Sequence, residues 1–352
     1  MKKTFKVIAV TASLLLAAAS MSACGDSSSP ASETESQSTS KQETKAAETE
    51  KTTKAAETTT ESTTEAEENN YSFSDLDADF SSTINETVMV DESGVRITAT
   101  SLEYTGYAAA LNVKIENNTE TDITVTAGTL GCPENAVNGY MVSDGYLNCD
   151  VAAGAAVADE ISFSYDNLVL YGITDIADIT IGFDIEGSDN KTILRTGPRK
   201  VETSLTGYDY GKDTFAEAMT DQILPLVYGY DVQFDRTDLL CSENGISIVS
   251  EVLITNQDGE DMLFIEVKND SDNILYASTF DVSVNGSEVY SYNTSSETIM
   301  GGTRCILSQD IKYIADKIGI DYDSFENLTF TLQVKDDNYS TVAEVEGIEI
   351  TK

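Results

Sequence analysis

Residues 111–117, Leu-Asn-Val-Lys-Ile-Glu-Asn, decide the fold because the chain contains this stretch twice. Its second copy is residues 263–269, Leu-Phe-Ile-Glu-Val-Lys-Asn. In the first copy apolar and polar residues alternate, which is typical of a β-strand with one buried face. Each copy runs into a polar turn, Asn-Asn-Thr at 117–119 and Asn-Asp-Ser at 269–271. The twin strands predict that one β-unit is present in duplicate.

The duplication extends over most of the chain, because residues 88 onward can be aligned with residues 239 onward at a shift of about 150. Residues 88–97 match 239–248, and Val-Asn-Gly at 137–139 matches 284–286. Asn-Gly between apolar strands is a strong signal for a tight hairpin. A repeat of this length indicates duplicated domains, since the units of a solenoid are much shorter.

Alternating apolar residues predict further strands in both halves. They lie at 179–185 and 328–334, and closing strands are expected near 200–203 and 347–351. Residues 167–171 and 310–317 instead place apolar residues on one helical face, which predicts one short helix in each copy. Seven or so short strands separated by turns predict a β-sandwich.

This pattern resembles the immunoglobulin-like domains of Gram-positive surface lipoproteins. The resemblance rests on the strand and turn order, the Asn-[Asn/Asp]-[Thr/Ser] turn and a glycine before a central strand, Gly154 or Gly302. It implies an extracytoplasmic binding or spacer role and no particular chemistry. The fold class expected is all-β, with two tandem immunoglobulin-like sandwiches, each with one short helix, at 71–206 and 231–352. Residues 207–230 are expected to form a junction, with a short helix at 214–224.

Residues 1–23 have the features of a targeting segment. Three lysines precede an apolar stretch of about 13 residues, which is too short to span a bilayer as a helix. The segment ends in Ser22-Ala23-Cys24, which resembles the lipobox of bacterial lipoproteins. That resemblance implies lipidation of Cys24 and anchoring at the outer face of the cell membrane. The alternative is an ordinary cleaved signal that leaves Cys24 as a free thiol.

Residues 24–70 consist mainly of Ser, Thr, Glu, Lys and Ala. Such a composition cannot bury enough apolar surface to offset the entropy of ordering, so a disordered acidic tether is expected. Its simplest role is to hold the folded part away from the membrane.

The chain has 61 acidic and 21 basic residues, a formal net charge of −40, and no histidine. This charge opposes nucleic-acid binding. The absence of histidine removes the commonest general base and the commonest zinc ligand. No nucleophile elbow or phosphate loop is found, so neither an enzyme nor a cofactor is expected.

One acidic segment partly fits a calcium-loop template, with oxygen ligands at positions 1, 3, 5 and 12. Position 6 is Phe80, where the template requires glycine. A solvated linker is the simpler interpretation in so acidic a chain. The candidate ligands are Asp75, Asp77, Asp79 and Glu86.

Four cysteines follow Cys24, and secretion permits disulfides between them. A Cys132–Cys149 bond would close a loop of about 17 residues and would stabilise the fold by about 3 kcal/mol. Cys241 and Cys305 align with valines of the first copy. That alignment favours two buried thiols over a Cys241–Cys305 disulfide.

The junction is rich in tyrosine. These side chains either form an aromatic ligand patch or, more simply, pack the two sandwiches together. They are Tyr208, Tyr210, Tyr228 and Tyr230.

The sequence therefore predicts a non-enzymatic, lipid-anchored surface module for binding or adhesion. Its partners would be the membrane, through the lipid, and an extracellular protein, peptide or wall ligand. The alternatives are a structural or assembly subunit of an envelope complex and, more remotely, an envelope hydrolase.

Overall fold

The structure is a computed structural model, and it describes residues 80–128, 135–205, 207, 214–215, 231–234, 239–255, 261–288, 296–321, 324 and 326–351. The expected leader (1–23) and tether (24–70) lie outside these residues. The described residues form an all-β protein with one short helix in each copy, as the sequence predicts, and the junction helix expected at 214–224 lies outside them except for residues 214–215.

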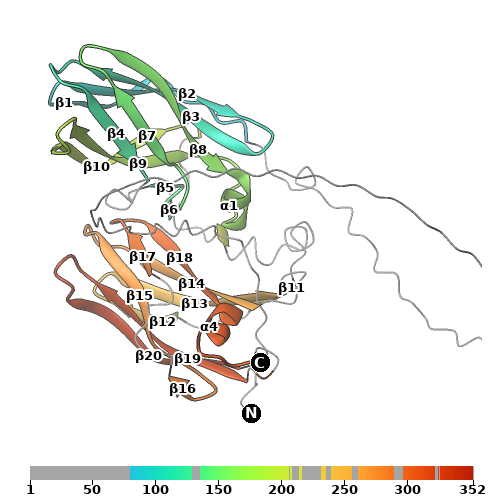
Figure 1. Cartoon of the computed structure of the whole chain (residues 1–352). Helices are drawn as coiled ribbons and strands as arrows, with labels where there is room; N and C mark the ends of the chain where they lie inside the picture. Colours follow the sequence, from blue (N-terminus) through green and yellow to red (C-terminus); the bar gives the residue numbers. More distant parts are fainter. Residues whose placement is uncertain are drawn as a thin grey trace, which may run out of the picture. The chain divides into compact units, whose positions relative to one another are not determined.

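Two sheets form the first sandwich (Figure 1). One has the order β1 (Thr87–Glu92), β2 (Val95–Tyr104), β3 (Ala108–Asn117) and β8 (Ala156–Ser164). The other has β9 (Asp178–Gly187) at its centre, paired with β10 (Thr192–Glu202) on one side. On its other side β9 pairs with β4 (Ile123–Ala127) and β5 (Ala136–Val137). β7 (Leu147–Val151) pairs with β4, and β6 (Tyr140–Met141) with β5.

The second sandwich repeats this plan (Figure 1). Its first sheet contains β11 (Asp231–Phe234), β12 (Leu239–Glu243), β13 (Ile246–Thr255), β14 (Asp261–Asn269) and β18 (Arg304–Asp310). This sheet is continuous, through the pairing of β18 with β6, with the second sheet of the first sandwich. Its second sheet contains β15 (Leu275–Val284), β16 (Ser287–Glu288), β17 (Ser296–Ile299), β19 (Asn327–Lys335) and β20 (Thr341–Thr351). The closing strands β10 and β20 both begin earlier than the sequence suggested, because each forms a hairpin with the strand before it.

The tight turns follow from residues that accept a positive φ. Asn138 and Gly139 have φ values of 49° and 78°, and Asn285 and Gly286 have 50° and 75°. Positive φ at both central residues is the type I′ geometry that matches the twist of hairpin strands. In each copy this turn asparagine also accepts hydrogen bonds from two backbone N–H groups, those of Ala177 and Asp178 or of Glu326 and Asn327.

The helices are α1 (Tyr165–Leu170) and α4 (Ile311–Lys317), and each comes directly after the last strand of its sandwich's first sheet, β8 or β18. Asp310 caps α4 by accepting a hydrogen bond of 2.9 Å from Tyr313 N. Both helices end before a left-handed glycine, Gly172 at φ 73° and Gly319 at φ 70°. The sequence predicted both helices to within about two residues.

The twin strands end in a buried asparagine that joins the two sheets of its sandwich. Asn117 Nδ2 donates to Thr121 O (2.8 Å) and to Val151 O of β7 (3.0 Å). Its Oδ1 accepts from Thr119 N and Oγ1, and its backbone N donates to Ala155 O next to β8. Asn117 therefore forms hydrogen bonds to both sheets of the first sandwich.

Asn269 repeats this network in the second sandwich. Its Nδ2 donates to Asn273 O and to Ile299 O and Met300 O at the end of β17. Its Oδ1 accepts from Ser271 N and Oγ. Both asparagines are fully buried. The polar turn recognised in the sequence is thus part of a structural network.

Strand register corrects one disulfide candidate. Cys241 is paired with Ile248, Ile248 with Val267, and Val267 with Cys305. The two cysteines are therefore three strands apart, about 14 Å at the usual strand spacing. A disulfide requires Cα atoms within about 7 Å, so this geometry excludes a Cys241–Cys305 bond. Both are free thiols, and they occupy the row held by Val90 and Val157 in the first sandwich.

Cys149 is also a free thiol in the structure, and Cys132 lies outside the described residues. The Cys132–Cys149 bond stays a prediction. Burial, with the neighbouring Asp159 carboxylate, raises the pKa of the Cys149 thiol to about 11.

Replacing Asn117 by Ala should lower the free energy of unfolding by about 2–3 kcal/mol, because buried carbonyl and hydroxyl partners lose their hydrogen bonds. Chemical denaturation measures this change. The matched control is Asn118→Ala, since Asn118 is exposed, and it should cost less than about 0.5 kcal/mol. Equal effects of the two substitutions would contradict the structural role of Asn117.

In the native protein Cys305 should resist thiol reagents at pH 8 and should react only after denaturation. Burial raises the pKa of this thiol well above its usual value, and the thiolate is the reactive form. Cys241, which is half-buried, should react earlier. Mass mapping without reductant checks this, and a crosslinked Cys241–Cys305 peptide would show that the register is wrong.

Candidate functional site

Most residues that the sequence singled out lie outside the described part of the chain. They are Cys24, Cys132, Asp75, Asp77, Asp79, Tyr208, Tyr210, Tyr228 and Tyr230. Glu86, the fourth calcium candidate, is exposed just before β1. Lipidation, calcium binding and the tyrosine patch stay predictions. Within the described residues no group of three or more Cys, Asp or Glu side chains could hold a metal ion.

A Ser-Tyr-Asp cluster lies where the chain enters the first sandwich. Ser82 Oγ and Tyr104 Oη are 2.6 Å apart, and Asp175 Oδ1 accepts hydrogen bonds from Ser82 N and Tyr104 Oη. Burial raises the pKa of the Tyr104 hydroxyl far above its usual value, so this hydroxyl stays protonated and is a poor base. Ser82 is itself buried. The cluster is therefore suited to fastening the chain, and not to nucleophilic catalysis.

The neighbouring contacts support that role. The ring of Phe80 stacks on the ring of Tyr165, with 4.4 Å between their centroids. Thr83 and Ser204 exchange hydrogen bonds where the chain enters and leaves the sandwich. Residues 80–83, in a lead-in that the sequence left unplaced, are thus held against the first sandwich.

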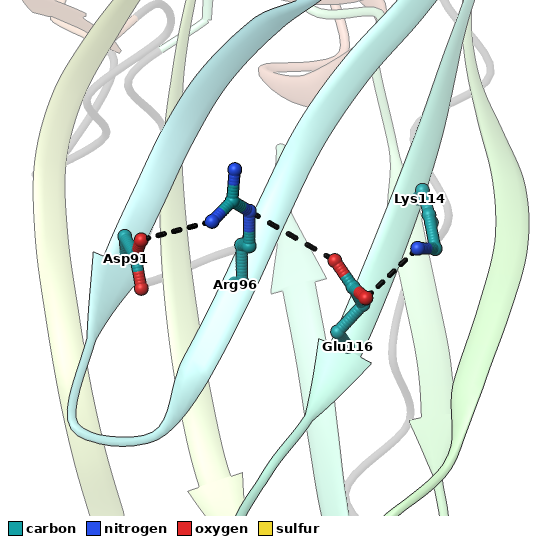
Figure 2. A network of polar contacts seen from close by, with 4 residues as sticks. All are labelled: Asp91, Arg96, Lys114 and Glu116. Atoms are coloured by element: carbon teal, nitrogen blue, oxygen red, sulfur yellow. Dashed lines mark hydrogen bonds and ion pairs between the residues drawn. The ribbon is translucent and has the colours of Figure 1, made fainter.

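The outer face of β1–β3 has a row of ion pairs. Figure 2 shows Arg96 between Asp91 and Glu116, with Lys114 on the other side of Glu116. The hydrogen bond from Lys114 holds the pKa of the Glu116 carboxyl below its usual value. All four side chains are substantially exposed, and exposed pairs contribute little to stability. Because their charges are mutually satisfied, these four side chains offer no uncompensated charge to a ligand.

The outer face of the second sandwich's second sheet is different. Tyr276, Ser278 and Phe280 lie in the outward row of β15, opposite the inward-facing Leu275, Ala277 and Thr279, and of the outward three Ser278 is buried. Gln333 and Lys335 of β19 are register partners of Ser278 and Tyr276. We name these five outward residues, Tyr276, Ser278, Phe280, Gln333 and Lys335, the Tyr276 face.

The Tyr276 face combines aromatic rings with a cation. Lys335 Nζ lies 4.4 Å from the centroid of the Phe280 ring, within the range of a cation–π contact. Lys335 forms no ion pair with a described carboxylate, whereas Lys114, Lys191, Lys200 and Lys268 all do. Tyr276 is partly exposed, and Gln333 Nε2 donates to Glu344. Such a surface can stack on a flat ligand and attract an acidic group on it.

The sequence carries a signal for this face. Residues 275–280 alternate between inward and outward positions. Once the inward residues are known, Tyr276 and Phe280 are recognised as two aromatic residues on the outward side of one strand. In the first sandwich the equivalent strands present Thr124, Thr126 and Asp184 instead, so the face belongs to the second copy alone.

The structure also buries a charged pair that the sequence did not single out. Arg304 Nη1 donates to Glu266 Oε1 at 2.8 Å, and the two residues are 5% and 2% exposed. A buried charge is tolerated only when it is paired and hydrogen-bonded, as here. Because both charges are buried and bonded to each other, this pair has a structural character.

No helix in the described residues has the length and hydropathy that a bilayer span requires. No protein-family model matches the sequence, and no curated protein is similar to it.

Among solved structures, the chain resembles red sea bream transglutaminase, at 9% identity over 76% of this chain and 31% of that one, with a TM-score of 0.19. It also resembles the exo-chitosanase of Amycolatopsis orientalis, at 15% identity over 67% and 25%, with a TM-score of 0.19. A conserved domain protein from Bacillus anthracis is 10% identical over 77% and 91%, with a TM-score of 0.21. The chain thus spans less than a third of either enzyme, and TM-scores this low carry no argument about what it does.

Proposed function

We propose that the chain is a non-enzymatic binding module, held at the outer face of the cell membrane by a lipid on Cys24. Its two immunoglobulin-like sandwiches present a binding surface to an extracellular protein, peptide or wall component. The expected leader, lipobox and acidic tether support the anchored location. The high negative charge argues against nucleic acid as a partner.

The Tyr276 face is the observation that carries the binding role. Its lysine is not paired with a described carboxylate in a chain where acids outnumber bases by 61 to 21. The Ser82–Tyr104–Asp175 cluster and the Arg304–Glu266 pair are fully engaged in structural contacts. The ligand that suits the Tyr276 face offers a flat apolar surface together with an acidic group, such as a sugar ring that carries a carboxylate or a phosphate.

Replacing Tyr276 and Lys335 together by Ala should weaken binding to cell walls, isolated from the bacterium that encodes the chain, by about 10-fold or more. About 1.4 kcal/mol of lost ring and cation contact is enough for that change. Co-sedimentation with the walls measures it. The matched control is Tyr313→Ala with Lys317→Ala, which removes one tyrosine and one lysine that are in cation–π contact (4.9 Å) on α4 and should leave binding unchanged.

Four outcomes would overturn this assignment. The assignment fails if the unmodified chain binds no wall material, or if the control substitutions weaken binding as much as those at the Tyr276 face. Crosslinking in cells that captures one stoichiometric membrane partner would instead favour an assembly subunit. Turnover of a wall substrate would favour a hydrolase.

Replacing Cys24 by Ser should release the chain from the membrane fraction, because no thiol remains to receive the lipid. Membrane fractionation and labelling with a radioactive fatty acid check this together. Two acyl chains anchor stably, since each buried CH₂ contributes about 0.8 kcal/mol. A Cys24→Ser variant that stays in the membrane fraction would rule out lipid on Cys24 as the anchor.

A further inference from the structure

The hairpin of the first sandwich contacts the edge of a sheet in the second. β6 runs parallel to β18, with Tyr140 and Arg304 as register partners. Arg304 N donates a hydrogen bond of 2.9 Å to Gly139 O. A main-chain bond of this kind joins a sheet of one sandwich to a sheet of the other.

The Arg304 side chain strengthens the same contact. Its guanidinium lies 5.1 Å from the centroid of the Tyr140 ring and is paired with Glu266 of β14. Tyr140 comes from the first sandwich, and Glu266 comes from the second. The guanidinium is buried, and its pairing with Glu266 compensates the cost of removing both charges from water. Removing the Tyr140 ring would expose this charged pair.

A third contact comes from the segment between the sandwiches. Phe215 is fully buried, and its backbone N donates to Tyr140 Oη at 3.2 Å. Its ring makes edge contacts with Tyr171 of the first sandwich (6.3 Å) and with Phe264 of the second (5.9 Å). Thr214 Oγ1 also donates to Tyr171 O at 2.8 Å. The connecting segment thus places one ring against both sandwiches.

The polar residues Arg304, Glu266 and Tyr140 of this contact have no counterpart of the same type in the other copy. The alignment of the twin strands puts Lys114 where Glu266 stands, and strand register puts Ala156 where Arg304 stands. Ser287 follows Asn285-Gly286 where Tyr140 follows Asn138-Gly139. The contact is therefore not an inherited property of the repeat. It is specific to the pairing of the first hairpin with the second sandwich.

We infer that Arg304, Glu266, Tyr140 and Phe215 form an interdomain lock that holds the two sandwiches as one rigid body. The lock fixes the direction in which the second sandwich, and with it the Tyr276 face, is presented relative to the first. It does not depend on the identity of the ligand.

Residual dipolar couplings of ¹⁵N-labelled residues 25–352 test the lock. Amides at 87–202 and at 239–351 should fit one common alignment tensor. In a variant with Arg304→Met and Glu266→Gln, which removes both charges together, the common tensor should be lost while each sandwich keeps its own. The matched control, Arg199→Met with Glu92→Gln, breaks an arginine–glutamate pair between β10 and β1 and should keep one tensor.

A second variant, Phe215→Ala, guards against misfolding because Phe215 lies outside the strands of both sandwiches. It should also separate the two tensors. The inference is overturned if the unmodified chain already needs two tensors. It is also overturned if Phe215→Ala and the charge-neutral variant both retain a common one.

Discussion

A buried amide at the end of a strand is the constraint on which each sandwich depends. In Asn117 and Asn269 the side-chain Nδ2 donates hydrogen bonds and the Oδ1 accepts them. Each side chain lies where the two sheets of its sandwich meet a turn. Burying such a group is favourable only when its hydrogen bonds are made, so the strand end, the turn and the neighbouring strand must adopt one arrangement. Hydrophobic burial drives collapse, whereas this amide selects the register.

The opposite turn of each copy uses the same device. The Asn138 amide donates to Asp175 O, and the Asn285 amide donates to Ser324 O. In both copies the acceptor lies just before the strand that pairs at the centre of the second sheet. Two asparagines per sandwich therefore hold the connections between layers, and the apolar rows between them can vary, as the exchange of valines for cysteines shows.

The sequence was sufficient for what depends on local pattern and on repetition. Alternation predicted the strands, Asn-Gly predicted the hairpins, and comparison of the copies predicted valine-sized thiols at Cys241 and Cys305. It was not sufficient for contacts between the copies. Glu266 aligns with the exposed Lys114, so comparison of the copies does not reveal that Glu266 is buried in a pair with Arg304, whose guanidinium lies by the Tyr140 ring of the first copy. Phe215 lies in a segment without a counterpart, so no repeat comparison could place it.

The most direct measurement for this account is amide hydrogen exchange, resolved by residue, at the two polar turns. Thr119 N and Ser271 N each donate to a buried asparagine oxygen at 3.0 Å, although they lie in surface turns. The account predicts slow and similar exchange at both amides, much slower than at the adjacent exposed Glu120. Exchange at Thr119 and Ser271 as fast as at Glu120, or protection in only one copy, would contradict a fold built twice around the same buried amide.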